Sequence, residues 1–301
     1  MQSVTSTVPL GEKTSFKIGG PAAWYAAPGS PGEVEELVLW AKGRSLPILV
    51  LGNGSNLLVS DAGWPGLAVD MSAALKNSCW HDACVDCDPG IRLSTLVRQA
   101  VERELSGLEC LAGIPGTVGG ALAMNAGAFG QEISACVEYV DTVHPGTGMR
   151  ARHQLPEMEF GYRHSSLQRD GVLIVGARLC MKPGDGKALK ETYERTLRKR
   201  RDKQPLDLPN CGSVFKRPKG GFAGALIEQC GLKGLREGGA EVSARHANFI
   251  VNRGDACAED VRRLIAGIQR RVHEETGVLL EPEVVFAGEF ATPLYEPAGR
   301  R

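Results

Sequence analysis

The chain has 301 residues, which is enough for two domains of ordinary size. Its 35 lysine and arginine residues balance its 35 aspartate and glutamate residues, so no overall field attracts nucleic acid or an anionic membrane. Hydrophobic residues make up 43% of the chain, and no apolar run approaches the ~20 residues that span a bilayer. The N-terminus lacks the basic start and apolar core of a signal peptide, so we expect a cytoplasmic protein.

The first part of the chain predicts a mixture of short strands and helices. Ser30 and Glu33 form a capping box with proline between them at the first helical position, and Gly43 ends the apolar face that follows. The pattern then predicts strands at 47–51, 67–71 and 84–88, a helix at 93–105, and strands near 137–143 and 172–181. Glycine and proline cluster at 182–186, where we place a domain boundary.

Beyond this boundary the composition changes. Residues 188–203 predict a basic helix, whose charges most simply form a solvated face. Residues 258–276 predict an amphipathic helix that ends at Gly277, and residues 278–286 predict a terminal strand. The predicted fold class is therefore α+β.

Two glycine-rich loops carry the clearest functional signal. One is Gly52–Asn56, which directly follows a predicted strand, and the other lies within residues 113–130. Glycine lets a ligand approach main-chain N–H groups, and such groups form concave anion sites that suit a pyrophosphate. Two loops favour a dinucleotide, although neither matches the Rossmann or P-loop fingerprint. For the upstream loop, a purely structural set of tight turns remains an equal alternative.

The nine cysteines do not predict a metal site. We expect most of them to be small buried hydrophobic residues. The spacing Cys79-x4-Cys84-x2-Cys87 imitates some iron–sulfur sites, but Cys84 and Cys87 would face opposite sides of a strand and no fourth cysteine follows at a matching distance. Cys211 would be a redox-sensitive thiol if its side chain were exposed.

Three further segments hold possible catalytic side chains. Arg163 is flanked by glycine and aromatic residues and could present its guanidinium to a carboxylate or phosphate. Ser213 follows a glycine, so its hydroxyl could project from a turn. Glu283 interrupts a strand that otherwise looks buried, where desolvation would raise its pKa. Each also has a simple structural interpretation: a surface ion pair, a turn residue and a solvent-facing strand position.

Taken together, eight segments in the same order make the chain resemble the UDP-N-acetylenolpyruvoylglucosamine reductase family, over about residues 14–288. They are Phe-Lys-Ile-Gly-Gly, Leu-Gly-Asn-Gly-Ser-Asn-Leu, Gly-Ile-Pro-Gly-Thr-Val-Gly-Gly, Met-Asn-Ala-Gly-Ala, Phe-Gly-Tyr-Arg, Gly-Ser-Val-Phe-Lys, His-Ala-Asn-Phe-Ile-Val-Asn and Glu-Pro-Glu-Val.

The resemblance implies an N-terminal, two-lobed FAD-binding module of the vanillyl-alcohol-oxidase type at 1–186, with lobes at about 1–72 and 73–186. A smaller α+β substrate domain at 187–290 and a tail at 291–301 would follow. The implied FAD-binding residues are Gly52, Asn53, Gly54, Ser55, Asn56, Gly113, Ile114, Pro115, Gly116, Thr117, Gly119, Gly120, Asn125, Ala126 and Gly127. Neither glycine loop contains histidine, so we expect FAD to be bound non-covalently.

The resemblance also implies a reaction, in which NADPH reduces FAD and the hydride passes to UDP-N-acetylglucosamine enolpyruvate. Ser213 would donate the proton, and Arg163 and Glu283 would stabilise the enolate-like intermediate. The implied substrate-binding residues are Tyr162, Lys203 and Arg217. His246 and Asn248 could contact the substrate or serve a structural role. We expect a monomer that acts on small molecules and binds no nucleic acid, membrane or metal.

One departure separates this chain from some family members. Those members carry an inserted loop, between the catalytic arginine and serine, that brings a tyrosine over the substrate. Here Tyr193, on the predicted basic helix, is the only tyrosine between Arg163 and Ser213, so the chain resembles the shorter subtype. Two alternatives remain: a different FAD-dependent oxidoreductase on the same module, and a catalytically silent flavin- or sugar-nucleotide-binding protein.

Overall fold

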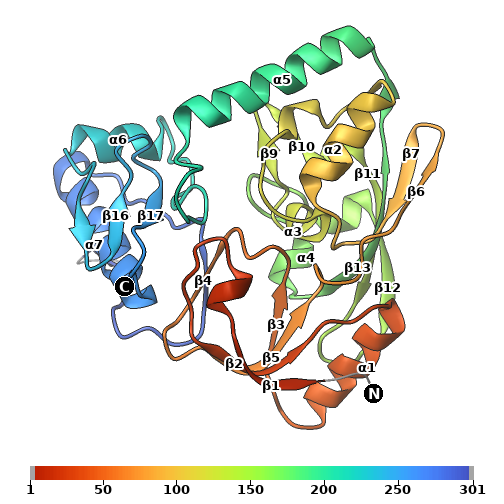
Figure 1. Ribbon diagram of the computed structural model, residues 1–301, viewed down its shortest axis with the longest axis horizontal. Helices are drawn as coiled ribbons and strands as arrows, with labels where there is room; N and C mark the ends of the chain where they lie inside the picture. Colours follow the sequence, from red (N-terminus) through yellow and green to blue (C-terminus); the bar gives the residue numbers. More distant parts are fainter. Residues whose placement is uncertain (1–3, 298–301) are drawn as a thin grey trace. The chain divides into compact units, whose positions relative to one another are not determined.

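The computed structural model describes residues 4–297, which form two compact units (Figure 1). Of these residues, the first unit contains 4–6, 24–53 and 66–200, and the second contains 7–23, 54–65 and 201–297. The units therefore interleave along the sequence. No helix among the described residues is both long enough and apolar enough to cross a membrane.

A five-stranded antiparallel sheet forms the centre of the first unit. Its strands, in spatial order, are β12 (Arg150–Gln154), β11 (Val137–Val143), β13 (Leu173–Cys180), β7 (Cys84–Cys87) and β6 (Ser78–His81). The helices α2 (Leu93–Glu102) and α3 (Val118–Ala123) share one hydrophobic core with this sheet. Burial alternates along β13 from Val175 to Cys180, as expected where a strand has one face in the core and one face outside.

A second core in the same unit surrounds helix α1 (Pro31–Lys42). Ser30 caps this helix, because its Oγ accepts a hydrogen bond from the Glu33 N–H at 3.2 Å, as predicted. Beside it lies a four-stranded sheet with the order β1 (Thr5–Pro9), β2 (Pro21–Ala26), β5 (Trp64–Asp70) and β3 (Ile48–Leu51). Strands β3 and β5 are parallel. The first glycine loop begins at Gly52, directly after the end of β3 at Leu51.

The other elements of the first unit are short, apart from the long helix α5. They are β8 (Leu105–Ser106), η2 (Glu109–Leu111), β9 (Gly127–Ala128), β10 (Gln131–Glu132), η3 (Ile133–Cys136), η4 (Leu155–Met158), α4 (Ser166–Arg169), β14 (Lys182–Pro183) and α5 (Gly186–Lys203), whose last three residues belong to the second unit.

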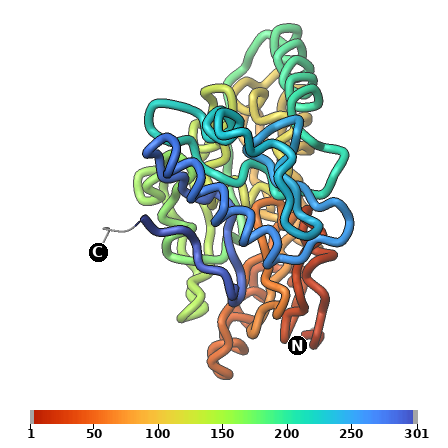
Figure 2. The backbone as a smooth tube through the Cα atoms, turned by 90° about the vertical axis from the view of Figure 1, so that its left-hand side faces the viewer, coloured from red at the N-terminus to blue at the C-terminus, as the bar shows by residue number. Residues whose placement is uncertain are grey.

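The second unit packs helices against a small antiparallel sheet. The elements are η1 (Gly11–Lys13), β4 (Leu57–Val59), α6 (Ala223–Gln229), β15 (Arg236–Glu237), β16 (Ala240–Val242), β17 (Ile250–Asn252), α7 (Ala258–Thr276) and β18 (Val285–Ala287). The helix α7, blue in Figures 1 and 2, packs on β15 and β16 and buries its apolar stripe. It ends at Gly277 in the left-handed conformation (φ 72°), as predicted.

Several predicted boundaries were wrong. The predicted helix 93–105 ends at Glu102, because Leu105 already pairs in the short strand β8. The predicted strand 278–286 is irregular up to Val285, since Pro282 has no N–H for a ladder. The predicted end of the first helix at Gly43 is confirmed, with a right-handed φ of −62° at this residue. The division into domains at 186/187 stays a prediction, since the compact units do not show which segment binds which ligand.

Candidate functional site

The two glycine loops meet in the first unit. A Cβ atom placed on Gly52 would lie 2.6 Å from the Thr117 Oγ1 of the second loop, closer than real atoms approach. Only glycine at position 52 therefore allows this contact. The proximity of the two loops is what a single dinucleotide site requires.

Hydrogen bonds fix the backbone of the second loop around Thr117. Its carbonyl at Gly116 accepts from the Leu93 N–H at 3.0 Å, and the Val118 N–H donates to the Ile91 carbonyl at 2.8 Å. Thr117 caps α3, with its Oγ1 accepting from the Gly120 N–H at 3.3 Å. Among the described residues, the N–H groups of Gly116 and Thr117 have no hydrogen-bond partner. Such donors fit a phosphate group.

The individual glycines of this loop have different reasons to be glycine. At Gly119 a Cβ would lie 2.9 Å from the Pro89 side chain, so close packing within the protein excludes one. At Gly120 the nearest atom would be Thr117 Oγ1 at an ordinary 3.6 Å. Gly113 has a φ of 75°, which disfavours any side chain, and a Cβ there would meet Arg200. Packing against Pro89 and Arg200 therefore accounts for glycine at positions 119 and 113, whereas it does not account for Gly120.

Gly54, Ser55 and Asn56 belong to the second unit. Gly54 has a left-handed φ of 58°, and a Cβ there would lie 2.4 Å from the Lys13 carbonyl oxygen. The Asn56 Nδ2 donates to the Glu283 carbonyl at 2.8 Å, and its carbonyl accepts from the Val285 N–H at 3.0 Å. Asn56 thus holds the backbone that carries Glu283, a role that the sequence did not predict.

Arg163 occupies an unusual turn in the first unit. The Gly161 and His164 backbones bond each other at 3.0 and 3.2 Å, and Arg163 between them is left-handed, with a φ of 53°. Such a conformation costs ~1–2 kcal/mol for a residue with a Cβ, so the surroundings must impose it. The turn therefore sets the direction of the Arg163 side chain.

Asn125 and Gly127 hold this turn in place. Asn125 is fully buried, and its Nδ2 donates to the Gly161 carbonyl at 3.0 Å and to Glu132 Oε2 at 2.8 Å. The Arg163 Nη2 in turn donates to the Gly127 carbonyl at 3.1 Å. The predicted cofactor segment 125–127 therefore positions the candidate catalytic arginine.

Arg200 is a site residue that the sequence analysis missed. It is half-buried, its Nε donates to the Ala112 carbonyl at 2.8 Å, and burial together with the charge of Arg163 lowers its pKa to about 10. It remains cationic at neutral pH. The sequence shows only that Arg200 lies on the same helical face as Tyr193 and Leu197, which pack on the core in the structure.

Ser213 and Glu283 lie together in the second unit. Ser213 follows Gly212, which is left-handed (φ 80°), and the Glu283 N–H donates to the Val214 carbonyl at 2.7 Å. This bond places Glu283 beside the residue that follows Ser213. In the described part of the chain, the Ser213 hydroxyl makes no hydrogen bond. It is half-buried and available to an incoming group.

A buried amide fixes the backbone after Ser213. The Asn248 Oδ1 accepts from the Phe215 N–H at 3.0 Å, its Nδ2 donates to the Phe215 carbonyl at 2.9 Å, and its own carbonyl accepts from the Val214 N–H. Asn248 therefore has a structural role, one of the two options left open for it. Cys211 is only 2% exposed and burial raises its pKa to about 12, so the exposed thiol imagined at this position does not exist.

The predicted substrate residues have different surroundings. Tyr162 is 51% exposed and lies under the Arg163 guanidinium, at 5.1 Å. In the second unit, the exposed Arg217 stacks on the exposed Phe222 ring at 4.1 Å, and Lys203 ends α5. His246 packs edge-on against Phe249, and burial lowers its pKa.

Cys84 and Cys180 are exceptions to the expectation that most cysteines are small buried hydrophobic residues. Cys87, Cys136, Cys211 and Cys230 are buried, but Cys84 and Cys180 form a disulfide. The sulfurs lie within 4.8 Å of a Glu138 oxygen, the spacing of a metal site, yet they are bonded to each other and not arranged as two ligands. Cys79 is exposed and lies opposite Asp86, away from this group.

Comparison with known proteins gives a consistent picture. Residues 22–152 match the FAD binding domain, and residues 204–287 match the C-terminal domain of UDP-N-acetylenolpyruvoylglucosamine reductase. The chain is 43% identical to the UDP-N-acetylenolpyruvoylglucosamine reductase of Caldicellulosiruptor bescii, over 96% of this chain and 92% of that protein. It is 45% identical to the protein of the same name in Synechococcus sp. WH7803, over 95% and 93%.

A solved structure agrees with these relatives. The crystal structure of UDP-N-acetylenolpyruvylglucosamine reductase from Thermus caldophilus superposes with a TM-score of 0.79 at 35% identity, covering 95% of this chain and 99% of that one. The predicted fold class, an FAD-binding module followed by a smaller α+β domain, is confirmed.

Proposed function

We propose that this chain, which belongs to the UDP-N-acetylenolpyruvoylglucosamine reductase family, reduces UDP-N-acetylglucosamine enolpyruvate to UDP-N-acetylmuramate at the expense of NADPH. The observation that carries this proposal is the combination of an FAD binding domain with the C-terminal domain of that reductase in one chain. The product is a precursor of peptidoglycan.

FAD, bound non-covalently, would supply the transfer of a hydride between NADPH and the enolpyruvyl group. The glycine loops around Gly52 and Thr117 would hold its pyrophosphate through main-chain N–H groups. No side chain of these loops is an acid or a base. Their task is binding and orientation.

Arg163 would bind the carboxylate of the enolpyruvyl group. Addition of a hydride to the terminal carbon places charge on the carbon next to this carboxylate, so a fixed guanidinium helps more in the transition state than in the ground state. The left-handed turn and its hydrogen bond to Gly127 would fix the guanidinium before the substrate arrives. Glu283 would act with it on the same intermediate.

Ser213 would donate the proton that completes the reduction. A hydroxyl is a weak acid, yet it suffices when the intermediate is a strong base and the hydroxyl lies within hydrogen-bond distance. Asn248 would support this role by fixing the backbone of Val214 and Phe215. Lys203 and Arg217, with Tyr162, would bind the substrate, the two cations matching its pyrophosphate.

We also propose that the enzyme works as a cytoplasmic monomer. The charge balance of the chain offers no attraction to an anionic surface, and its substrates are small molecules. Light scattering on the eluting protein would test the monomer directly, since a dimer would have twice the mass.

The decisive experiment is anaerobic stopped-flow spectroscopy at the flavin absorbance band. Protein reduced with one equivalent of NADPH is mixed with UDP-N-acetylglucosamine enolpyruvate. Rapid return of the oxidised spectrum, with UDP-N-acetylmuramate as product, supports the proposal. A flavin that stays reduced until oxygen enters would instead indicate an oxidase of other specificity, and a protein without flavin would indicate a silent binding protein.

A further inference from the structure

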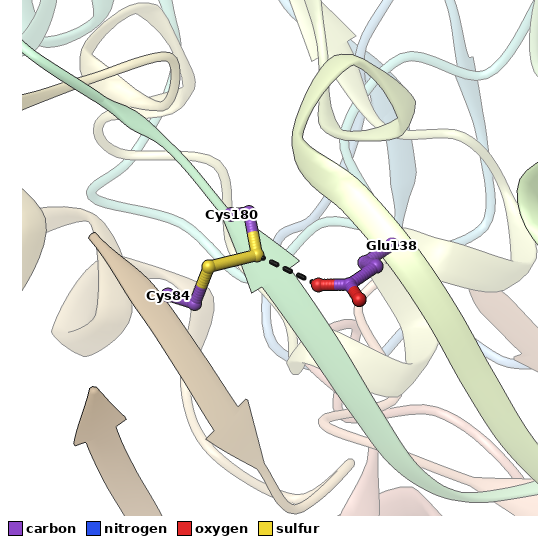
Figure 3. Close-up of side chains that lie close together, drawn as sticks. All are labelled: Cys84, Glu138 and Cys180. Atoms are coloured by element: carbon purple, nitrogen blue, oxygen red, sulfur yellow. Dashed lines mark hydrogen bonds between the residues drawn. A yellow bond between two sulfur atoms is a disulfide. The ribbon is translucent and has the colours of Figure 1, made fainter. Parts of the chain in front are cut away.

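Cys84 and Cys180 face each other across two neighbouring strands of the first unit. They are direct partners in the antiparallel register of β7 and β13, and the Met181 N–H donates to the Ala83 carbonyl just beyond them. This pattern makes them a non-hydrogen-bonded pair, in which Cα atoms lie ~4.5 Å apart and both side chains point to the same face. Their observed Cα separation is 4.1 Å. The ladder alone therefore brings the two sulfurs together, and they are bonded (Figure 3).

The pair is within reach of solvent. Cys84 and Cys180 are both partly exposed, whereas Cys87 on the same strand is buried. Cys79, the exposed cysteine of β6, lies opposite Asp86 and has no cysteine as its register partner. Among the described residues, this pair alone combines matched register with access.

A carboxylate lies beside one of the two sulfurs. The Glu138 Oε2 is 2.9 Å from the Cys180 Sγ, the contact that is dashed in Figure 3. A disulfide sulfur carries no proton, so this contact becomes an S–H···O hydrogen bond only in the dithiol form. The Arg178 Nε lies 3.3 Å from the same oxygen, within ion-pair distance but without hydrogen-bond geometry, so a positive charge faces the carboxylate.

We propose that Cys84 and Cys180 form a reversible redox site, which closes by exchange with a small-molecule disulfide such as oxidised glutathione. The Cys84 thiolate attacks one glutathione sulfur, forming a mixed disulfide and releasing the first glutathione. The Cys180 thiol then gives its proton to Glu138, attacks the Cys84 sulfur and releases the second glutathione. Two protein thiols are oxidised to one disulfide, and one glutathione disulfide is reduced to two thiols. Excess reduced glutathione reverses both steps.

Closure acts on the edge of the sheet. The hairpin of β6 and β7 is attached to β13 by pairing over Cys84–Cys87, and the disulfide joins that pairing at the end next to the hairpin turn. Following β7, the carbonyls of Pro89 and Ile91 accept hydrogen bonds from the N–H groups of Gly119 and Val118. The closed site therefore fixes the hairpin, and the segment after the hairpin is hydrogen-bonded to the second glycine loop.

The test compares the full-length protein after reduction with the same protein equilibrated with oxidised glutathione. Alkylation and peptide mass spectrometry should show Cys84 and Cys180 as reactive thiols in the first sample and as one disulfide in the second. Melting should shift upward by several degrees on closure, because the crosslink spans 96 residues. Hydrogen exchange should slow at residues 78–87.

Four variants make the result specific. Cys180→Ser should stop at a glutathione adduct on Cys84, and Cys84→Ser should lack that adduct. Both should lose the melting shift, while Cys79→Ser should behave like the unaltered protein. Glu138→Gln should close to the same extent but several-fold more slowly, which a merely structural glutamate would not produce. Free Cys84 and Cys180 thiols at equilibrium with oxidised glutathione, or a disulfide between other cysteines, would overturn the proposal. An unchanged closing rate in Glu138→Gln would remove Glu138 from it.

Discussion

The candidate site uses different chemical groups in the two units. In the first unit the glycine loops offer main-chain groups. In the second unit the candidate residues offer side chains, and the amide side chains of neighbouring asparagines fix the backbone that carries them. Gly52 and the loop at Thr117 offer N–H groups and close approach, and add no acid or base. Ser213 and Glu283 offer a hydroxyl and a carboxyl group, and the side chains of Asn248 and Asn56 bond the backbone beside them.

This difference predicts different sensitivities. A site made of backbone tolerates changes of polarity but fails when a Cβ enters it, since packing leaves no room. A site made of side chains tolerates added volume at its edge but fails when one functional atom is removed. Variants in the two units should therefore separate cofactor binding from chemistry.

Replacement of Ser213 should have the largest effect. Ser213→Ala removes the proposed proton donor, so reoxidation of the reduced flavin by substrate should slow by ~10²–10⁴-fold. Reduction by NADPH and the flavin content should not change, because neither depends on this hydroxyl. Stopped-flow measurement of both half-reactions provides the control within one protein. Normal reoxidation by substrate in Ser213→Ala would contradict the assigned role.

A side chain at position 52 should weaken the binding of FAD, the role proposed for the glycine loops of the first unit. Gly52→Val places a Cβ that would lie 2.6 Å from Thr117 Oγ1, so FAD should bind ~10–100-fold more weakly, as expected for overpacking of ~1–3 kcal/mol. Flavin titration followed by fluorescence measures this.

Gly267→Ala is the control, because no atom lies within 4 Å of its added Cβ and the residue lies in α7, outside both glycine loops. It should retain FAD, and a glycine-to-alanine change inside a helix favours that helix. Equal loss of FAD in both variants would show that the clash at position 52 is not the cause.

Replacement of Asn248, in the second unit, should lower stability and slow the chemistry without changing the affinity for FAD. Asn248→Ala removes two hydrogen bonds to the Phe215 backbone in the interior, which should lower the free energy of unfolding by ~1–3 kcal/mol. Reoxidation by substrate should slow as well, while FAD affinity stays the same. Urea denaturation and flavin titration measure the two quantities.

The smallest expected effect is a dependence of stability on alkaline pH. Burial raises the pKa of Cys87 and Cys211 to about 12 and that of Cys136 to about 11. The unfolded chain loses these protons near pH 9, whereas the folded chain keeps them, so stability should fall as pH rises from about 9 towards 12. Urea denaturation from pH 8 to pH 11 measures the slope, which should be shallower in Cys211→Ala. An identical slope would mean that Cys211 does not contribute.

Local features of the fold could be predicted from the sequence. The capping box at Ser30, the amphipathic helix that ends at Gly277 and the strand 137–143 depend on residues close to one another in the chain. The candidate residues in the glycine loops were likewise visible, because glycine and short apolar strands are local signals.

Features that depend on distant partners could not be predicted. The disulfide joins cysteines 96 positions apart, and nothing near Cys84 indicates that Cys180 lies opposite it. The burial of Arg200 depends on the carbonyl of Ala112 and on the missing side chain of Gly113. The roles of Asn56 and Asn248 depend on which backbone groups they meet after folding.

The interleaving of the two units has a consequence for the order in which this protein becomes folded on the ribosome. Phe16, Ile18 and Leu58 belong to the hydrophobic core of the second unit, whose other members come from residues 211–284. The hydrogen bond from Asn56 to Glu283 joins residues 227 positions apart, which is a delay of roughly 10–45 s at ~5–20 residues per second. During this time the early segments lack their partners and expose apolar side chains. Until residues 211–284 have been made, segments 7–23 and 54–65 cannot bury these side chains, and a fragment ending near residue 200 would leave them exposed.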